Sequence, residues 1–197
     1  MRVLIAEDDP VIAMGLVARL ESLAHEVLPP ASDGERAVQA ARDHRPDLYL
    51  FDIDLPRLDG LAAARRLAEE GLRRPVVAIT GVDDPALVER SAEVGADAFL
   101  TKPIDERELD AAIRLAAGRH AELEALEAEV ARAREALEER KLVEHAKGIL
   151  IEALGLSEPE ALRRMRRLAR DRNATLPEVA RAVIEQRELL TPNKGRE

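Results

Sequence analysis

The sequence predicts an α/β fold, namely a doubly wound five-stranded parallel sheet, followed by a long coiled-coil helix and a small three-helix bundle. In the first 104 residues, short apolar runs alternate with amphipathic stretches of helical period. After residue 104 the strand-like runs stop and helical periodicity continues. Charge divides the chain in the same way, because residues 1–118 carry a net −9 and residues 140–197 a net +4. We therefore predict domains at 1–118 and 140–197, joined by a coiled-coil linker at 119–139.

The strands are expected in "VLIA", "EVL" at 26–28, "DLYLFDI", "PVVAIT" and "DAFLT". Helix starts are expected at Asp9-Pro10 and Asp84-Pro85, where an N-cap precedes proline at the first helical position, and helix ends at Gly71 and Gly95. Such alternation favours a parallel sheet covered on both faces. Its ligand site is then expected at the carboxyl ends of the strands.

A single helix of about forty residues is expected after Asp105, because Asp105 and Glu108 form a capping-box pattern and no breaker precedes Gly148. Apolar residues recur along it at heptad spacing, although Arg119 and Arg140 interrupt one row. The stripe could pack on its own domain, but the length and glutamate content favour a dimer coil. The predicted dimer seam comprises Leu123, Leu126, Val130 and Leu137.

The tail is predicted to hold three helices that end near residues 154, 171 and 189. Ser157 with Glu160, and Thr175 with Glu178, form capping-box patterns, each followed by proline in the first turn.

Composition excludes several classes of function. The chain has no cysteine, so any metal is expected to be held by oxygen. No apolar run approaches the roughly 20 residues of a membrane span, and Met1 leads directly into "RVLIAEDD", which predicts a cytoplasmic protein without membrane contact. Tyr49, Phe51 and Phe99 are the three aromatic residues, too few for a base-stacking platform.

Acidic residues gather where the predicted strands end. Glu7, Asp8 and Asp9 follow the first strand and Asp52 ends the third, while Thr80 and Lys102 end the fourth and fifth. Crowded carboxylates favour a hard divalent cation, so we expect Mg²⁺. One carboxylate could then accept a phosphoryl group, with a lysine ammonium and a hydroxyl at its oxygens. Each residue alone has a plainer explanation, and Asp9 is expected to cap a helix.

Residues 1 to about 118 resemble the receiver domain of bacterial response regulators, which has a flavodoxin-like fold. The resemblance rests on Glu7-Asp8, on Asp52 in "FDIDLPRLDG", on Thr80, and on Phe99 before Lys102-Pro103. It implies that Asp52 accepts a phosphoryl group from a sensor histidine kinase. It also implies that Glu7, Asp8, Asp52 and the main-chain carbonyl of Asp54 hold Mg²⁺, that Lys102 and Thr80 bind the phosphate, and that Phe99 is the switch aromatic. Gly81 departs from the alanine usual in the family.

Residues from about 135 to 190 resemble the ANTAR domain, an RNA-binding antitermination module. The resemblance rests on Ala146-Lys147-Gly148, Arg164, Ala169 and "NATLPEVARAVI", whereas Leu162 replaces a usual aromatic residue. It implies binding to hairpin RNA in a transcript leader. On a helical wheel, arginines oppose an apolar arc, with Arg164 at the border. The predicted RNA-binding residues are Lys147, Arg163, Arg164, Arg166, Arg167 and Arg170.

Together these features predict a response regulator that is not an enzyme and that forms a homodimer on activation. Three alternatives stay open. The arginine face could be an ordinary solvated surface. The last two helices could bind DNA as a helix-turn-helix, although the arginines precede the expected recognition helix. Finally, Asp52 and Asp54 in "DID" fit an Asp-nucleophile phosphohydrolase, a class that usually carries this pair on its first strand.

Overall fold

The computed structural model describes residues 1–81 and 96–190, which form two compact units, Met1–Ala125 and Leu126–Glu197. The expected helix start at Asp84-Pro85 and the expected helix end at Gly95 lie outside the described residues. Each unit has its own hydrophobic core and is described by itself.

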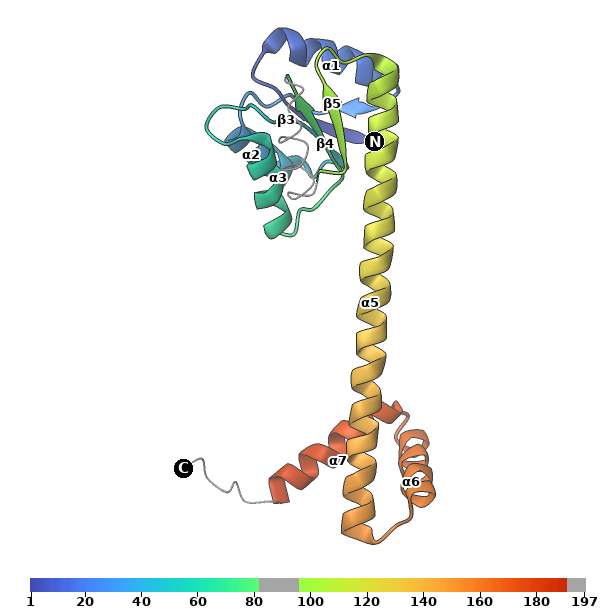
Figure 1. Cartoon of the computed structure of the whole chain (residues 1–197). Helices are drawn as coiled ribbons and strands as arrows, with labels where there is room; N and C mark the ends of the chain where they lie inside the picture. The colour runs from blue at the N-terminus through green and yellow to red at the C-terminus, as the bar shows by residue number, and fades with distance from the viewer. Residues whose placement is uncertain (82–95, 191–197) are drawn as a thin grey trace. The chain divides into compact units, whose positions relative to one another are not determined.

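The first unit is built on a five-stranded sheet whose strands are all parallel, in the order β2-β1-β3-β4-β5 (Figure 1). This sheet confirms the predicted fold class, and the weak "EVL" run does form a short edge strand. The strands are β1 (Arg2–Ala6), β2 (Glu26–Val27), β3 (Leu48–Asp52), β4 (Val76–Thr80) and β5 (Ala98–Thr101).

Helices cover both faces of this sheet because side chains alternate along each strand. On one face, Val3 and Ile5 of β1 share a core with α1 (Pro10–Ser22) and with the start of α5 (Glu106–Leu154). On the other face, Leu4 packs with α2 (Gly34–His44) and α3 (Gly60–Glu69). Because the strands are parallel and packed on both faces, their carboxyl ends lie together at one edge of the sheet.

Aspartates start the first three helices. The carboxylate of Asp9 accepts a hydrogen bond of 2.7 Å from the backbone N–H of Val11, which confirms it as the N-cap before Pro10. Asp33 and Asp59 cap α2 and α3 in the same way. The predicted helix end at Gly71 is also confirmed, since α3 ends at Glu69 and Gly71 has φ of 76°.

The long helix α5 spans 49 residues, from Glu106 to Leu154. It confirms the expectation of one unbroken helix after Asp105, whose side chain accepts from the N–H of Glu108 at 2.8 Å. The helix is longer than the expected forty residues because Gly148 does not break it, so the first of the three expected tail helices is the end of α5. The apolar stripe has two parts. Leu109 and Ala116 are buried in the core of the first unit, whereas the next members of the stripe, Leu123, Leu126, Val130 and Leu137, are exposed. Packing on its own domain therefore accounts for the first part of the stripe alone.

The second unit packs the end of α5 against α6 (Glu158–Asp171) and α7 (Leu176–Leu190), as predicted. The backbone N–H of Ser157 donates to Glu160 at 2.9 Å, and that of Thr175 to Glu178 at 2.7 Å, so both capping boxes form. The buried side chains of its core are Ala146, Leu150, Ala161, Met165, Val179 and Ala180.

None of the helices in the described ranges is long and apolar enough to cross a membrane.

Gly60, the first residue of α3, packs against the end of β3 so closely that a Cβ atom would lie 2.0 Å from the carbonyl oxygen of Asp52. We expect Gly60→Ala to destabilise the first unit by about 1–3 kcal/mol, because buried backbone must shift. A Cβ atom on Gly118, in α5, would meet no described atom within 4 Å beyond its own stretch of helix. Gly118→Ala should therefore stabilise the same unit by up to about 1 kcal/mol. Urea unfolding followed by circular dichroism checks both, and equal effects would contradict this packing.

Candidate functional site

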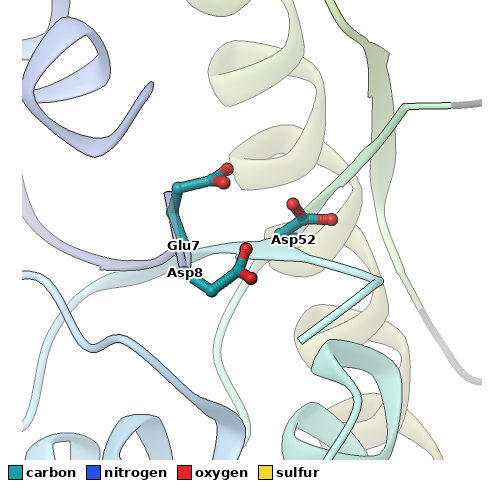
Figure 2. Close-up of side chains that lie close together, drawn as sticks. All are labelled: Glu7, Asp8 and Asp52. Carbon is teal, nitrogen blue, oxygen red and sulfur yellow. The ribbon is translucent and has the colours of Figure 1, made fainter. Parts of the chain in front are cut away.

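The acidic residues predicted at the strand ends do come together. Glu7 and Asp8 follow β1, and Asp52 ends the neighbouring β3, where Ala6 pairs with Phe51. Figure 2 shows the three side chains side by side, and one carboxylate oxygen from each lies within 4.8 Å of the other two. Glu7 and Asp52 are buried, whereas Asp8 is exposed. Parallel pairing of the two strands thus creates the cluster.

Lys102, after β5, joins the two buried carboxylates. Its Nζ lies 2.5 Å from Asp52 Oδ2 and 2.8 Å from Glu7 Oε2. Partial burial works against the ammonium, but the hydrogen bonds to Asp52 and Glu7 outweigh it and raise the pKa of Lys102. The ammonium therefore stays charged beside the Asp52 carboxylate.

The donor set fits a hard divalent cation. Burial raises the pKa of Glu7, and the hydrogen bond from Lys102 offsets part of that rise. Glu7 Oε2 is buried without a hydrogen bond among the described residues, although the ammonium of Lys102 lies near it. One lysine charge faces three carboxylates, so a further cation at their oxygens is electrostatically favourable.

The loop after β3 begins at this cluster. The backbone N–H of Asp54 donates to Asp52 Oδ1 at 3.0 Å, and the Asp54 side chain is exposed. This bond holds the start of the loop beside the Asp52 carboxylate. The loop closes again at Gly60, whose N–H donates to the carbonyl of Ile53 at 3.2 Å.

Thr80 and Phe99 lie at different places on their strands, since Thr80 ends β4 and Phe99 is the second residue of β5. Thr80 is buried at the end of β4, and its carbonyl accepts from the N–H of Lys102 at 2.9 Å. Phe99, on β5, is partly buried against a small cluster that includes Ile53 and Leu61. Gly81, which departs from the family pattern, is exposed directly after Thr80.

The arginines of α6 form a continuous exposed face. Ala161 and Met165 on the opposite side are fully buried, which agrees with the wheel. The structure places Arg164, left at the border by the wheel, among the exposed residues. A groove runs along this arginine face, and Leu156, Ala169 and Leu176 contribute apolar atoms to its lining. The arginine face comprises Arg163, Arg164, Arg166, Arg167 and Arg170.

Lys147, which the ANTAR resemblance placed with the arginines, has a different environment. It is buried, and its Nζ lies 2.6 Å from both Glu144 and Glu158. Hydrogen bonds to these two carboxylates raise its pKa. Because Glu158 begins α6, Lys147 joins α6 to α5 in this structure, and the arginine face does not include it.

The predicted dimer seam is exposed. The exposed fractions of its side chains lie between 36% for Leu123 and 59% for Leu126, with Val130 and Leu137 between them. Each is a large apolar side chain on a helix whose other exposed residues are mostly charged or alanine. The seam therefore leaves apolar area in contact with water in a single chain.

Two ion pairs, one near the acidic cluster and one at the start of α6, involve residues that were not predicted from the sequence. Asp33 and Arg57 pair with each other at 3.4 Å and come from two different loops. Lys147 and its partner Glu158 come from two different helices. The pattern Asp33-Gly34 before an amphipathic helix is an N-cap signal and could have identified Asp33. The long-range pairs have no such signal.

Comparison with known proteins supports the family resemblance of both parts of the chain. The family model described as "Response regulator receiver domain" matches residues 3–114, and the model described as "ANTAR domain" matches residues 131–184.

Among relatives, the "Transcriptional regulatory protein PdtaR" of Mycobacterium tuberculosis is 44% identical over 184 residues, 93% of this chain and 89% of that protein. The "Alkaline phosphatase synthesis transcriptional regulatory protein PhoP" of Bacillus subtilis is 34% identical over 57% of this chain and 47% of its own length.

Among the solved structures that match are two receiver domains. The signal receiver domain of a modulated diguanylate cyclase from Desulfovibrio desulfuricans has a TM-score of 0.55 and 39% identity, and covers 60% of this chain and 94% of its own. The receiver domain of the putative response regulator NarL from Mycobacterium tuberculosis has a TM-score of 0.55 and 32% identity, over 58% of this chain and 94% of its own. With a family model matching more than half of its length and a relative matching nearly all of it, the chain belongs to the response regulators and carries an N-terminal receiver domain and a C-terminal ANTAR domain.

Proposed function

We propose that this response regulator is phosphorylated on Asp52 by a sensor histidine kinase, and that its ANTAR domain then binds hairpin RNA to control transcription antitermination. The observation that carries the proposal is the contact of Asp52 with Lys102 beside Glu7, in the same chain as an exposed arginine face. A phosphate-accepting site and an RNA-binding surface are the input and output that such a regulator requires.

In the transfer step, an oxygen of Asp52 attacks the phosphorus of a phosphohistidine, so a P–O bond forms while the P–N bond breaks. Glu7, Asp8, Asp52 and the main-chain carbonyl of Asp54 are the residues that would hold Mg²⁺. When bound, Mg²⁺ would neutralise charge on the transferred group. Lys102 supplies a second positive charge and Thr80 a hydroxyl donor. Repacking of Phe99 would then carry the change to the surface.

Asp52→Asn is expected to abolish phosphorylation by acetyl phosphate in the presence of Mg²⁺, because the amide removes the nucleophilic oxygen charge. A phosphate-affinity gel measures the phosphorylated fraction. Asp54→Asn, two residues away, should still be phosphorylated, since the proposed role of Asp54 uses its main-chain carbonyl. Phosphorylation of Asp52→Asn at the wild-type level would exclude Asp52 as the acceptor.

The Asp54 variant also tests the phosphohydrolase alternative. That alternative requires Asp54 as acid and base, so loss of turnover on small phosphoesters in Asp54→Asn would support an enzyme. The pair lies at the end of β3 instead of β1, and both matched domains are regulatory. We therefore favour a regulatory role for this site.

For RNA binding, the proposal rests on the position of the arginine face on α6. Its five guanidinium groups can contact phosphates, and A-form RNA is recognised mainly through backbone, shape and loops. DNA readout as a helix-turn-helix would require base contacts from α7, the helix that follows the arginines. About five phosphate contacts, at the roughly 0.7 per contact found for single strands, predict a slope of log K against log[salt] near −3.5.

Arg163→Ala combined with Arg167→Ala should weaken binding to a hairpin RNA and make the salt slope shallower by about 1.4, because two phosphate contacts are lost. Filter binding or fluorescence anisotropy across a salt series measures both quantities. Arg132→Ala with Arg134→Ala, on α5, is the matched control, since it removes the same charge outside the arginine face. If both double variants weaken binding equally, the arginine face is not the RNA site.

We further propose that phosphorylation favours a homodimer through the exposed seam on α5, with residues 119–139 acting as the linker between the two domains. Two helices that pair along Leu126, Val130 and Leu137 bury this apolar area. A dimer brings two arginine faces to one RNA, and effective concentration then raises the overall affinity.

In the wild type, acetyl phosphate is expected to raise both the mass and the RNA affinity. Val130→Asp is expected to prevent both rises, because dimerisation would bury an unpaired carboxylate in the seam. Ala128→Asp introduces the same charge at a heptad position outside the seam and should leave dimerisation intact. Sedimentation equilibrium with and without acetyl phosphate measures the mass. A Val130→Asp protein that dimerises like the wild type would disprove the seam, and equal RNA affinity with and without acetyl phosphate would disprove the switch.

A further inference from the structure

Residues 31–34, which lead from β2 into the start of α2, contact both the backbone of Glu7 and the loop that follows Asp52. We propose that Asp33 and Arg57 form a positioning pair that fixes the loop after β3 at the metal-binding oxygens. The inference rests on the proposed Mg²⁺ site and assigns roles to two residues outside it. Neither touches the phosphoryl group, so both would act through the loop that carries Asp54.

On the β1 side, this segment is hydrogen-bonded to the backbone that presents Glu7. The N–H of Glu7 donates to the carbonyl of Ala31 at 3.0 Å, and the N–H of Ala31 donates to the carbonyl of Ile5 at 2.9 Å. These two bonds extend the parallel pairing past the end of β1. Residues 31–34 are thereby fixed relative to the Glu7 carboxylate.

On the β3 side, the same segment lies directly against the loop of residues 53–59. A Cβ atom on Gly34 would lie 1.9 Å from the carbonyl oxygen of Leu58, so the backbones touch there. One residue earlier, Asp33 Oδ2 lies 3.4 Å from Nη1 of Arg57. The loop is thus held to the segment by a backbone contact and by an ion pair.

Asp33 is well suited to act as an anchor. Its side chain is 3% exposed, and its Oδ1 accepts a hydrogen bond of 2.9 Å from the backbone N–H of Arg36. A buried carboxylate needs compensating charge, which Arg36 and Arg57 provide. Because Asp33 caps α2, it cannot follow the loop if the loop moves.

The loop itself depends on such an anchor. Apart from the bond between Gly60 and Ile53 that closes the loop, its internal backbone bonds are short-range, from Leu55 to Ile53 and from Leu58 to Pro56. Arg57 has φ of 66°, a left-handed conformation that is unfavourable for a residue with a side chain. The ion pair with Asp33 favours this conformation, and a loop freed from it could relax and move the Asp54 carbonyl away from the cluster.

A neutral substitution of Arg57 separates positioning from simple electrostatics, because the two effects have opposite signs. Removing a cation near a Mg²⁺ site strengthens Mg²⁺ binding, because the Coulomb repulsion between the two cations is lost. Releasing the loop weakens Mg²⁺ binding, because the Asp54 carbonyl moves away from the cluster. Arg36→Ala is the matched control, since Arg36 also pairs with Asp33 at 3.5 Å and is similarly exposed, but belongs to α2.

The test is calorimetric titration of the full chain with Mg²⁺ alone, for the wild type, Arg57→Ala, Arg57→Lys and Arg36→Ala. We expect about fivefold weaker Mg²⁺ binding in Arg57→Ala, near-wild-type binding in Arg57→Lys, and unchanged or tighter binding in Arg36→Ala. Thermal unfolding without Mg²⁺ should show all four proteins folded. A slower phosphorylation of Arg57→Ala by acetyl phosphate, recovered at high Mg²⁺, is the corresponding kinetic result.

Binding by Arg57→Ala that equals or exceeds that of the wild type and of Arg36→Ala would overturn the positioning role while leaving the metal site intact. Mg²⁺ binding that is absent in the wild type, or unaffected by Asp52→Asn, would instead overturn the proposed site and this inference with it. Gly34→Ala, which should disturb the backbone contact with Leu58, gives a second variant, and Mg²⁺ affinity at the wild-type level in a folded Gly34→Ala protein would also count against the positioning role.

Discussion

The contact of Lys102 with Asp52 and Glu7 is the interaction on which the arrangement of the acidic cluster depends. It joins the ends of β1, β3 and β5 at one edge of the sheet, with a positive charge beside a buried carboxylate. Burial raises the pKa of Glu7, whereas the hydrogen bond from the Lys102 ammonium favours the charged form of that carboxylate. These charges are costly to bury, and in our proposal they are also what binds a cation and a phosphoryl group.

The second domain solves a different electrostatic problem. Five arginines repel one another, so their helix needs an apolar face that is well packed, and Ala161 and Met165 provide it. Lys147 adds to this by pairing with Glu158 at the start of α6 and with Glu144 on α5. Because the charge of Lys147 is used to join two helices, the basic surface that we propose for RNA binding is formed by the exposed arginines of α6 alone.

The long helix α5 contributes residues to both domains, and its apolar stripe changes role along its length. Leu109 and Ala116 belong to the core of the first unit, while Val130 and Leu137 are exposed. One sequence periodicity therefore serves packing first and, in our proposal, dimerisation afterwards. The heptad pattern predicted the helix and its stripe, but it could not show where burial ends, because both uses need the same spacing.

The sequence by itself determined the five parallel strands, the caps at Asp9, Ser157 and Thr175, and the gathering of acids at the strand ends, because these depend on local spacing and on the geometry of parallel sheets. Tertiary structure alone decided the pairing of Lys147 with Glu158 and of Asp33 with Arg57, and the exposure of Arg164. These depend on which loops and helices meet in space, and residues far apart in sequence carry no periodic signal of their contact.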